Sequence, residues 1–170
     1  MTHDYVIAVG GAVLQAGPVT GPSPTAIAWA ADRVLAVGPD DVVRAISRGD
    51  STFLDIGGCA VTAAPDDPQS ALDLVRVAAA AGRPFDPTTV LADAGLLASP
   101  APLEPGAPAD LAFWSADPGT ILPGSATSLR IVAIVRAGAF TEGDEHCGPF
   151  PRLRPTDPVA PPTQGPVVVL

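Results

Sequence analysis

The 170-residue sequence contains no lysine, and its 18 acidic residues outnumber nine arginines, which gives a net charge of −9. Nucleic-acid binding needs clustered cations to neutralise phosphates, so this balance argues against a nucleic-acid partner. It equally disfavours attachment to an anionic membrane surface. Every apolar run falls short of the ~20 residues of a membrane span, and the N-terminus lacks the pattern of a signal peptide. We therefore expect a cytoplasmic protein.

Aromatic residues are also scarce, at 5% of the sequence, whereas hydrophobic residues together make up 47%. This hydrophobic content is enough for a folded core and argues against a disordered chain. The length supports one domain rather than two. Because aromatic residues are few, we expect the core to be packed mainly with small aliphatic side chains.

Cysteine and histidine, the residues most used to bind transition metals, occur only twice each. Cys59 and Cys147 lie far apart and match no metal-binding or redox spacing, and whether they pair is left open. His3 and His146 lie near the two chain ends, which are poor places to hold a catalytic geometry. His146-Cys147 is either an exposed part of the tail or a weak metal cluster formed between several copies.

Motifs for nucleophilic catalysis and for phosphate binding are absent from the sequence. No Gly-x-Ser-x-Gly segment occurs, and no serine or cysteine has a recognisable base partner. Gly10-Gly11 and Gly57-Gly58 do not match a phosphate-binding fingerprint and fit bends between strands. Asp40-Asp41 fits the positive end of a short helix better than an acid/base pair. The sequence therefore assigns no catalytic, cofactor-binding or metal-binding residue.

Short apolar runs separated by turn residues dominate the first 62 residues and predict a mainly β fold. Ala31-Asp32 fits a two-residue hairpin loop, where Asp32 has a structural rather than a catalytic role. A short helix is expected over residues 40–47. The predicted strands cover residues 5–9, 12–14, 25–30, 33–37, 52–56 and 60–62. The first two are either adjacent strands or one strand with a glycine bulge.

From Ala63 onward the pattern changes and predicts a pair of helices. Asp66 or Asp67 is the expected N-cap of the first helix, with Pro68 in its first turn. This helix covers about residues 70–81 and ends at Gly82. Its apolar face is either Leu72, Val75 and Ala79 or Leu74, Val77 and Ala81. The second helix begins at Asp86-Pro87 and runs to about Leu97.

Residues 103–114 then combine a turn with the start of a strand. Pro105-Gly106 fits a type II turn, and Asp110 precedes the apolar residues 111–114. Two more strands, over residues 131–135 and 139–141, surround the hairpin signature Ala137-Gly138. From residue 143 the chain is rich in proline, which predicts an extended or disordered tail. Val167–Leu170 is apolar enough to join the edge of a sheet.

Three of these stretches resemble the amidohydrolase superfamily, metal-dependent hydrolases that include imidazolonepropionase-like enzymes. Residues 25–38 are similar to its hairpin A-I-x-x-x-D-G-R-I-x-x-V-G. Residues 53–62 are similar to V-I-D-L-G-G-x-x-V-x-P-G, which precedes the catalytic barrel. The third stretch consists of residues 103–118, similar to G-x-L-x-P-G-x-x-A-D-L-V-x-x-D, followed by residues 131–140, similar to the closing V-x-x-V-x-x-x-G-x-x-V. The resemblance covers about residues 5–62 and 96–140.

The resemblance implies a composite β-sandwich, built from both ends of the chain, that normally flanks a metal-binding (β/α)8 barrel. Such a barrel needs ~250 residues, whereas the first helix begins only about five residues after Thr62. The His-x-His motif expected there is missing from residues 63–67. Asp66-Asp67-Pro68 resembles the aspartate motif after the last barrel strand, but zinc sites need three protein ligands or more. The expected domain is therefore residues 1–142, with a helical insert at about 66–98.

Three functions follow as hypotheses. The first is a non-catalytic structural or regulatory remnant of an amidohydrolase without a cofactor, and the second is a hydrolase of carbon–nitrogen bonds whose site is assembled between subunits. The third is a module that binds a small ligand. Loss of a barrel is expected to expose Val75, Leu91 and Leu97, which would favour a homo-oligomer or association with a related full-length protein.

Overall fold

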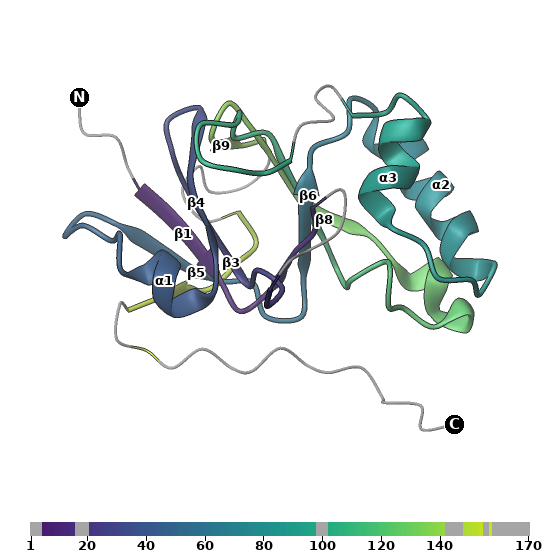
Figure 1. The fold of residues 1–170 in the computed structure, drawn as a ribbon, viewed down its shortest axis with the longest axis horizontal. Helices are drawn as coiled ribbons and strands as arrows, with labels where there is room; N and C mark the ends of the chain where they lie inside the picture. The colour runs from purple at the N-terminus through teal and green to yellow at the C-terminus, as the bar shows by residue number, and fades with distance from the viewer. Residues whose placement is uncertain (1–4, 16–20, 98–101, 142–147, 155–156, 158–170) are drawn as a thin grey trace.

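The computed structural model describes residues 5–15, 21–97, 102–141, 148–154 and 157. Across these residues, ten strands form two five-stranded sheets that pack face to face (Figure 1). The first sheet has the order β10 (Arg152–Leu153), β5 (Thr52–Asp55), β1 (Tyr5–Val9), β3 (Ala26–Ala30) and β4 (Arg33–Gly38). The second has the order β2 (Ala12–Val13), β6 (Ala60–Ala63), β7 (Leu111–Trp114), β8 (Ile131–Arg136) and β9 (Ala139–Phe140). The predicted mainly β fold is confirmed.

Helices lie on the outer faces of both sheets (Figure 1). α1 (Asp40–Arg44) lies on the first sheet, where Val43 packs against its apolar residues. α2 (Pro68–Ala80), α3 (Pro87–Asp93) and the 3-10 helix η1 (Pro123–Ser128) lie together on the second. The molecule therefore has four layers, in the order α1, first sheet, second sheet and helix group.

The predicted starts of the helix pair are confirmed. Asp67, rather than Asp66, is the N-cap of α2, and Asp86 is the N-cap of α3. A proline occupies the first turn of each helix, where its missing N–H has no intrahelical partner to lose. The predicted helix ends were too late: α1 ends at Arg44 instead of residue 47, and α3 at Asp93 instead of residue 97.

The core between the sheets is centred on a cluster of aromatic rings. The ring centroid of Phe113 in β7 lies 6.3 Å from that of Trp29, 6.0 Å from that of Phe140 and 4.9 Å from that of Phe150. All four residues are buried. The prediction of an aliphatic core is confirmed for the strands around this cluster but is wrong for its centre, because half of the eight aromatic residues gather there.

Two glycine pairs carry the chain from the first sheet to the second. Gly10-Gly11 joins β1 to β2, and Gly57-Gly58 joins β5 to β6. The strands on each side of these crossings run parallel, β1 beside β5 and β2 beside β6. A Cβ at Gly11 would lie 2.9 Å from the carbonyl oxygen of Cys59, so the two crossings are packed together. The two strands predicted over residues 5–9 and 12–14 are confirmed, but they belong to different sheets and are neither paired with each other nor one bulged strand.

The predicted turn at residues 103–110 connects the two sheets by pairing with both hairpins. Ala109 N–H donates to the carbonyl oxygen of Asp32 in the β3–β4 hairpin, at 2.8 Å. The Ala109 carbonyl accepts from Gly138 N–H in the β8–β9 hairpin, at 3.0 Å. Asp110 accepts a 2.7 Å hydrogen bond from Ala137 N–H through its carboxylate. Asp110, directly before β7 as the sequence indicated, thus orders the turn between β8 and β9.

The apolar faces of α2 and α3 are covered by the second sheet. Val75 and Leu91 are fully buried with Trp114 and Leu129, and Leu97 is half-buried. The prediction that Val75 and Leu91 form an exposed patch is therefore wrong, because the helix pair packs onto the sheet itself. Of the two predicted faces the one containing Val75 is buried, whereas Val77 is 70% exposed.

The part of the tail that the structure describes adds to the first sheet. β10 pairs antiparallel with β5, and Phe150 just before it enters the core. The sequence placed a possible edge strand at Val167–Leu170 instead, which lies outside the described residues. Among the described helices, none has the length and apolar character needed to cross a membrane.

We predict that Gly138→Ala destabilises the fold far more than Gly106→Ala. Both glycines have positive φ, so each substitution strains the backbone by about 1–2 kcal/mol. A Cβ at Gly138 would lie 1.4 Å from the carbonyl oxygen of Ala31, whereas nothing lies within 4 Å of one at Gly106. Overpacking should raise the loss for Gly138→Ala to about 3 kcal/mol or more. Urea denaturation of both variants measures the difference, and equal losses would contradict the close contact between the hairpins.

Candidate functional site

A cleft of about 370 Å³ lies between α2 and β8 on the outer face of the second sheet. Pro68, Gln69 and Leu72 line it from α2, and residues 130–134 line it from β8 and the residue before this strand. Thr141 completes the lining after β9. Its volume lies within the range of roughly 300–1,000 Å³ that is usual for small-molecule sites.

Two arginines hold α2 beside β8, one at each end of the cleft. Arg76 of α2 donates to the carbonyl oxygen of Leu129 from Nη2 at 2.7 Å and from Nε at 3.1 Å. At the other end, Arg136 of β8 donates from Nη2 to the carbonyl oxygen of Pro65. The start of α2 therefore lies near the end of β8, and the helix runs antiparallel to the strand.

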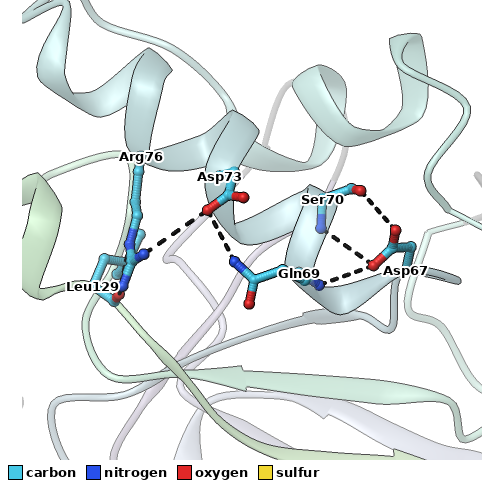
Figure 2. Close-up of polar contacts among 6 residues, drawn as sticks. All are labelled: Asp67, Gln69, Ser70, Asp73, Arg76 and Leu129. Carbon is cyan, nitrogen blue, oxygen red and sulfur yellow. Dashed lines mark hydrogen bonds and ion pairs between the residues drawn. The ribbon is translucent and has the colours of Figure 1, made fainter.

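Figure 2 shows a row of polar contacts along α2. One member of this row, Gln69, also lines the cleft. Asp67 accepts from Gln69 N–H at 3.1 Å and from the Ser70 hydroxyl at 2.6 Å. Asp73 accepts from Nε2 of Gln69 at 3.0 Å and lies 3.9 Å from Nη1 of Arg76. This row fixes the side chain of Gln69 and pairs both carboxylates, which leaves neither of them poised as a general base.

Asp66 and Asp67, whose motif resembles the aspartate motif of the amidohydrolases, belong to no group of three possible metal ligands in the described part of the chain. The hydrogen bonds from Ser70 lower the pKa of Asp67, as expected for a carboxylate that caps a helix. Among the described residues, no three histidine, cysteine or acidic side chains are grouped so that they could hold a metal ion. His3, His146 and Cys147 lie outside the described residues.

The contacts of the remaining candidate residues, Cys59, Asp32 and Asp40, indicate structural rather than catalytic roles. Cys59 is half-buried, and burial followed by the charge of Asp55 raises its thiol pKa, which disfavours a reactive thiolate. Asp32 lies in the β3–β4 turn, 3.6 Å from Nε of Arg33. Asp40 does not cap α1; its Oδ1 accepts from the hydroxyl of Thr25 at 2.6 Å and so ties the helix to the first sheet.

A second acidic pair, Asp86 and Asp117, lies at the start of α3. Burial raises the pKa of Asp117 against a hydrogen bond from Gly119 N–H, and the charge of Asp86 raises it further. Burial also acts to raise the pKa of Asp86, but hydrogen bonds from Thr88 and Thr89 outweigh it, so that this pKa is lowered. Both carboxylates order local backbone, and no pattern in the sequence indicates that Asp117 lies beside Asp86.

The sequence does not predict the cleft between α2 and β8. Its two walls are about 60 residues apart in the chain, and only the packing of α2 along β8 brings them together. Arg130, just before an apolar strand, resembles an ordinary boundary residue in the sequence. Comparisons with protein-family models, with curated proteins and with solved structures each returned no match.

We predict that Arg76→Gln destabilises the protein by about 1–3 kcal/mol, because the carbonyl of the buried Leu129 loses two hydrogen bonds from a charged donor. Arg83→Gln is the matched control, since Arg83 is exposed in the turn after α2. Urea midpoints of the two variants measure the effect. A loss for Arg76→Gln no larger than that for Arg83→Gln would contradict the anchoring role.

Asp117→Asn should make the protein more stable at pH 7. Because the pKa of Asp117 is raised in the fold, the folded chain holds a proton that the unfolded chain has lost at pH values between the two pKa values. Stability therefore falls as the pH rises from the unfolded-state pKa through the folded-state pKa. Asparagine keeps the acceptor for Gly119 N–H without the charge.

The stabilisation should disappear below the unfolded-state pKa of about 3.9, and thermal unfolding at pH 7 and at pH 3 tests this dependence. Asp86→Asn is the opposite control, because a carboxylate with a lowered pKa stabilises the fold above its unfolded-state pKa. At pH 7 this second variant should be less stable than the wild type. Changes of the same sign in the two variants would contradict the assignment.

Proposed function

We propose that this chain is a non-catalytic relative of the amidohydrolases, reduced to their composite β-sandwich and two helices, with a structural or regulatory role. The connection between β6 and α2 carries this proposal. Only residues 64–67 separate the two elements, and Ala64 N–H and Asp66 N–H donate to the carbonyl oxygens of Asp110 and Leu96. This short, hydrogen-bonded connection occupies the position where the resemblance would place the catalytic barrel.

The make-up of the two sheets supports the composite part of the proposal. In the first sheet, four strands precede the helix pair in the chain and β10 follows it. In the second, β2 and β6 precede the helices, while β7, β8 and β9 follow them. Strands from both sides of the insert therefore complete each sheet, as expected for the flanking segments of such an enzyme.

A second candidate function is the binding of a small ligand, which the α2–β8 cleft favours. A hydrolase whose metal site is assembled between subunits is the competing outcome, because the described residues of one chain do not group three metal ligands. Metal content and turnover distinguish this hydrolase from both non-catalytic candidates.

We predict that the purified chain, loaded with zinc and then desalted, retains far less than one zinc per chain. It should also fail to turn over amides, lactams or aminopurines in the presence of divalent metals. Elemental analysis and product detection by chromatography measure these outcomes. The double variant Asp66→Asn, Asp67→Asn is the control, since asparagine can still cap α2. About one zinc per chain, or metal-dependent turnover that this variant loses, would overturn the proposal.

A further inference from the structure

We propose that the α2–β8 cleft binds a small organic carboxylate with an apolar body, such as a medium-chain aliphatic acid. This inference rests on the second candidate function, ligand binding, and names the class of ligand. Three observations carry it: the apolar walls of the cleft, the one charged side chain among the described residues that line it, and the fixed separation of its two walls.

The walls offer apolar surface that a ligand can cover. Leu72 projects from α2, and Ile131, Val132 and Ile134 come from β8. Val132 is 38% exposed, which makes it one of the few large hydrophobic side chains open to solvent among the described residues. Covering such surface with an alkyl chain is favourable by roughly 25 cal/mol per Å² of apolar area removed from water.

The charge of the cleft selects an anion. Among the described residues that line it, Arg130 is the only one that carries a charge, and this arginine lies on a chain whose net charge is −9. A guanidinium group pairs well with a carboxylate, because its fork of N–H donors matches the two carboxylate oxygens. The ligand therefore has an acidic head rather than a basic one.

The remaining polar groups favour a singly charged head over a phosphate. Nε2 of Gln69 donates to Asp73, and the hydroxyl of Thr141 donates to the carbonyl oxygen of Ile134. Each of these two groups already donates one hydrogen bond, and Arg130 is the one cation among the described lining residues, which suits a singly charged head better than a doubly charged one. A carboxylate requires only the pairing with Arg130.

The cleft is held open before any ligand binds. Arg76 of α2 donates to the carbonyl of Leu129, just before β8, and Arg136 of β8 donates to the carbonyl of Pro65, in the connection that leads into α2. The burial of Val75 and Leu91 keeps the helix pair on the sheet between these anchors. Such preorganisation lowers the entropy cost of binding, because the protein does not have to order the site.

Titration of the full chain with octanoate, followed by calorimetry and by backbone amide NMR, tests the proposal. We expect saturable binding, with the largest amide shifts in residues 130–134 and at Leu72. Octanamide has the same alkyl body without the charge and should bind at least tenfold more weakly. Acetate has the charge without the body and should not saturate. Octanoate binding should also weaken as salt is added, because Arg130 is exposed.

Variants locate the site and keep the test independent of folding. Arg130→Gln should weaken octanoate binding at least tenfold and leave octanamide binding unchanged, whereas Arg83→Gln should change neither. Val132→Asp should abolish octanoate binding, and its thermal midpoint shows whether it still folds. Equal affinity for octanoate and octanamide, an unchanged affinity in Arg130→Gln, shifts outside the cleft, or no binding at millimolar octanoate would each overturn the proposal. Metal content and turnover are unaffected by these results, so the two proposals fail separately.

Discussion

The contact between the two hairpin tips constrains much of the remaining structure. A carbonyl of the β3–β4 turn occupies the space next to Gly138 in the β8–β9 turn, and the indole N–H of Trp29 donates to the carbonyl of Gly138 at 3.0 Å. Ala109 bonds to both turns through its own backbone. Since β7 begins two residues later, this contact also fixes where β7 enters beside β6, with Leu111 opposite Ala63.

The position of β7 in turn separates the two apolar layers of the second sheet. Phe113 points into the core between the sheets, and its neighbour Trp114 points toward the helix pair. Beneath the helices, the indole N–H of Trp114 donates to the hydroxyl of Thr62 at 3.0 Å, which satisfies two polar groups in a fully buried place. One strand thus joins the sandwich core to the helix layer, and the burial of Val75 and Leu91 follows from it.

Features set by local chemistry could be predicted from the sequence. The N-caps Asp67 and Asp86 are an example. Each side chain accepts a hydrogen bond from a backbone N–H only two or three residues later, so the arrangement depends on the local sequence alone. The hairpins at Ala31 and Ala137 were equally predictable, since two-residue turns leave few alternatives. Features set by contacts between distant parts of the chain could not be predicted from the sequence. Gly10-Gly11 was recognised as a break, but only the pairing of β2 with β6 assigns the second strand to the other sheet.

The burial of Val75 shows the same limit for the helix pair, because periodicity identifies an apolar face without identifying what covers it. Predicting the cleft would require the tertiary packing as well, because its two walls meet only where α2 is anchored along β8. That anchoring also determines the chemistry available there. Asp67 and Asp73 accept hydrogen bonds from α2 itself, and among the described residues that line the cleft the walls are largely apolar and Arg130 is the one cation. The proposal of an anion site therefore depends on how α2 packs along β8, because this packing places Arg130 beside the apolar residues of both walls.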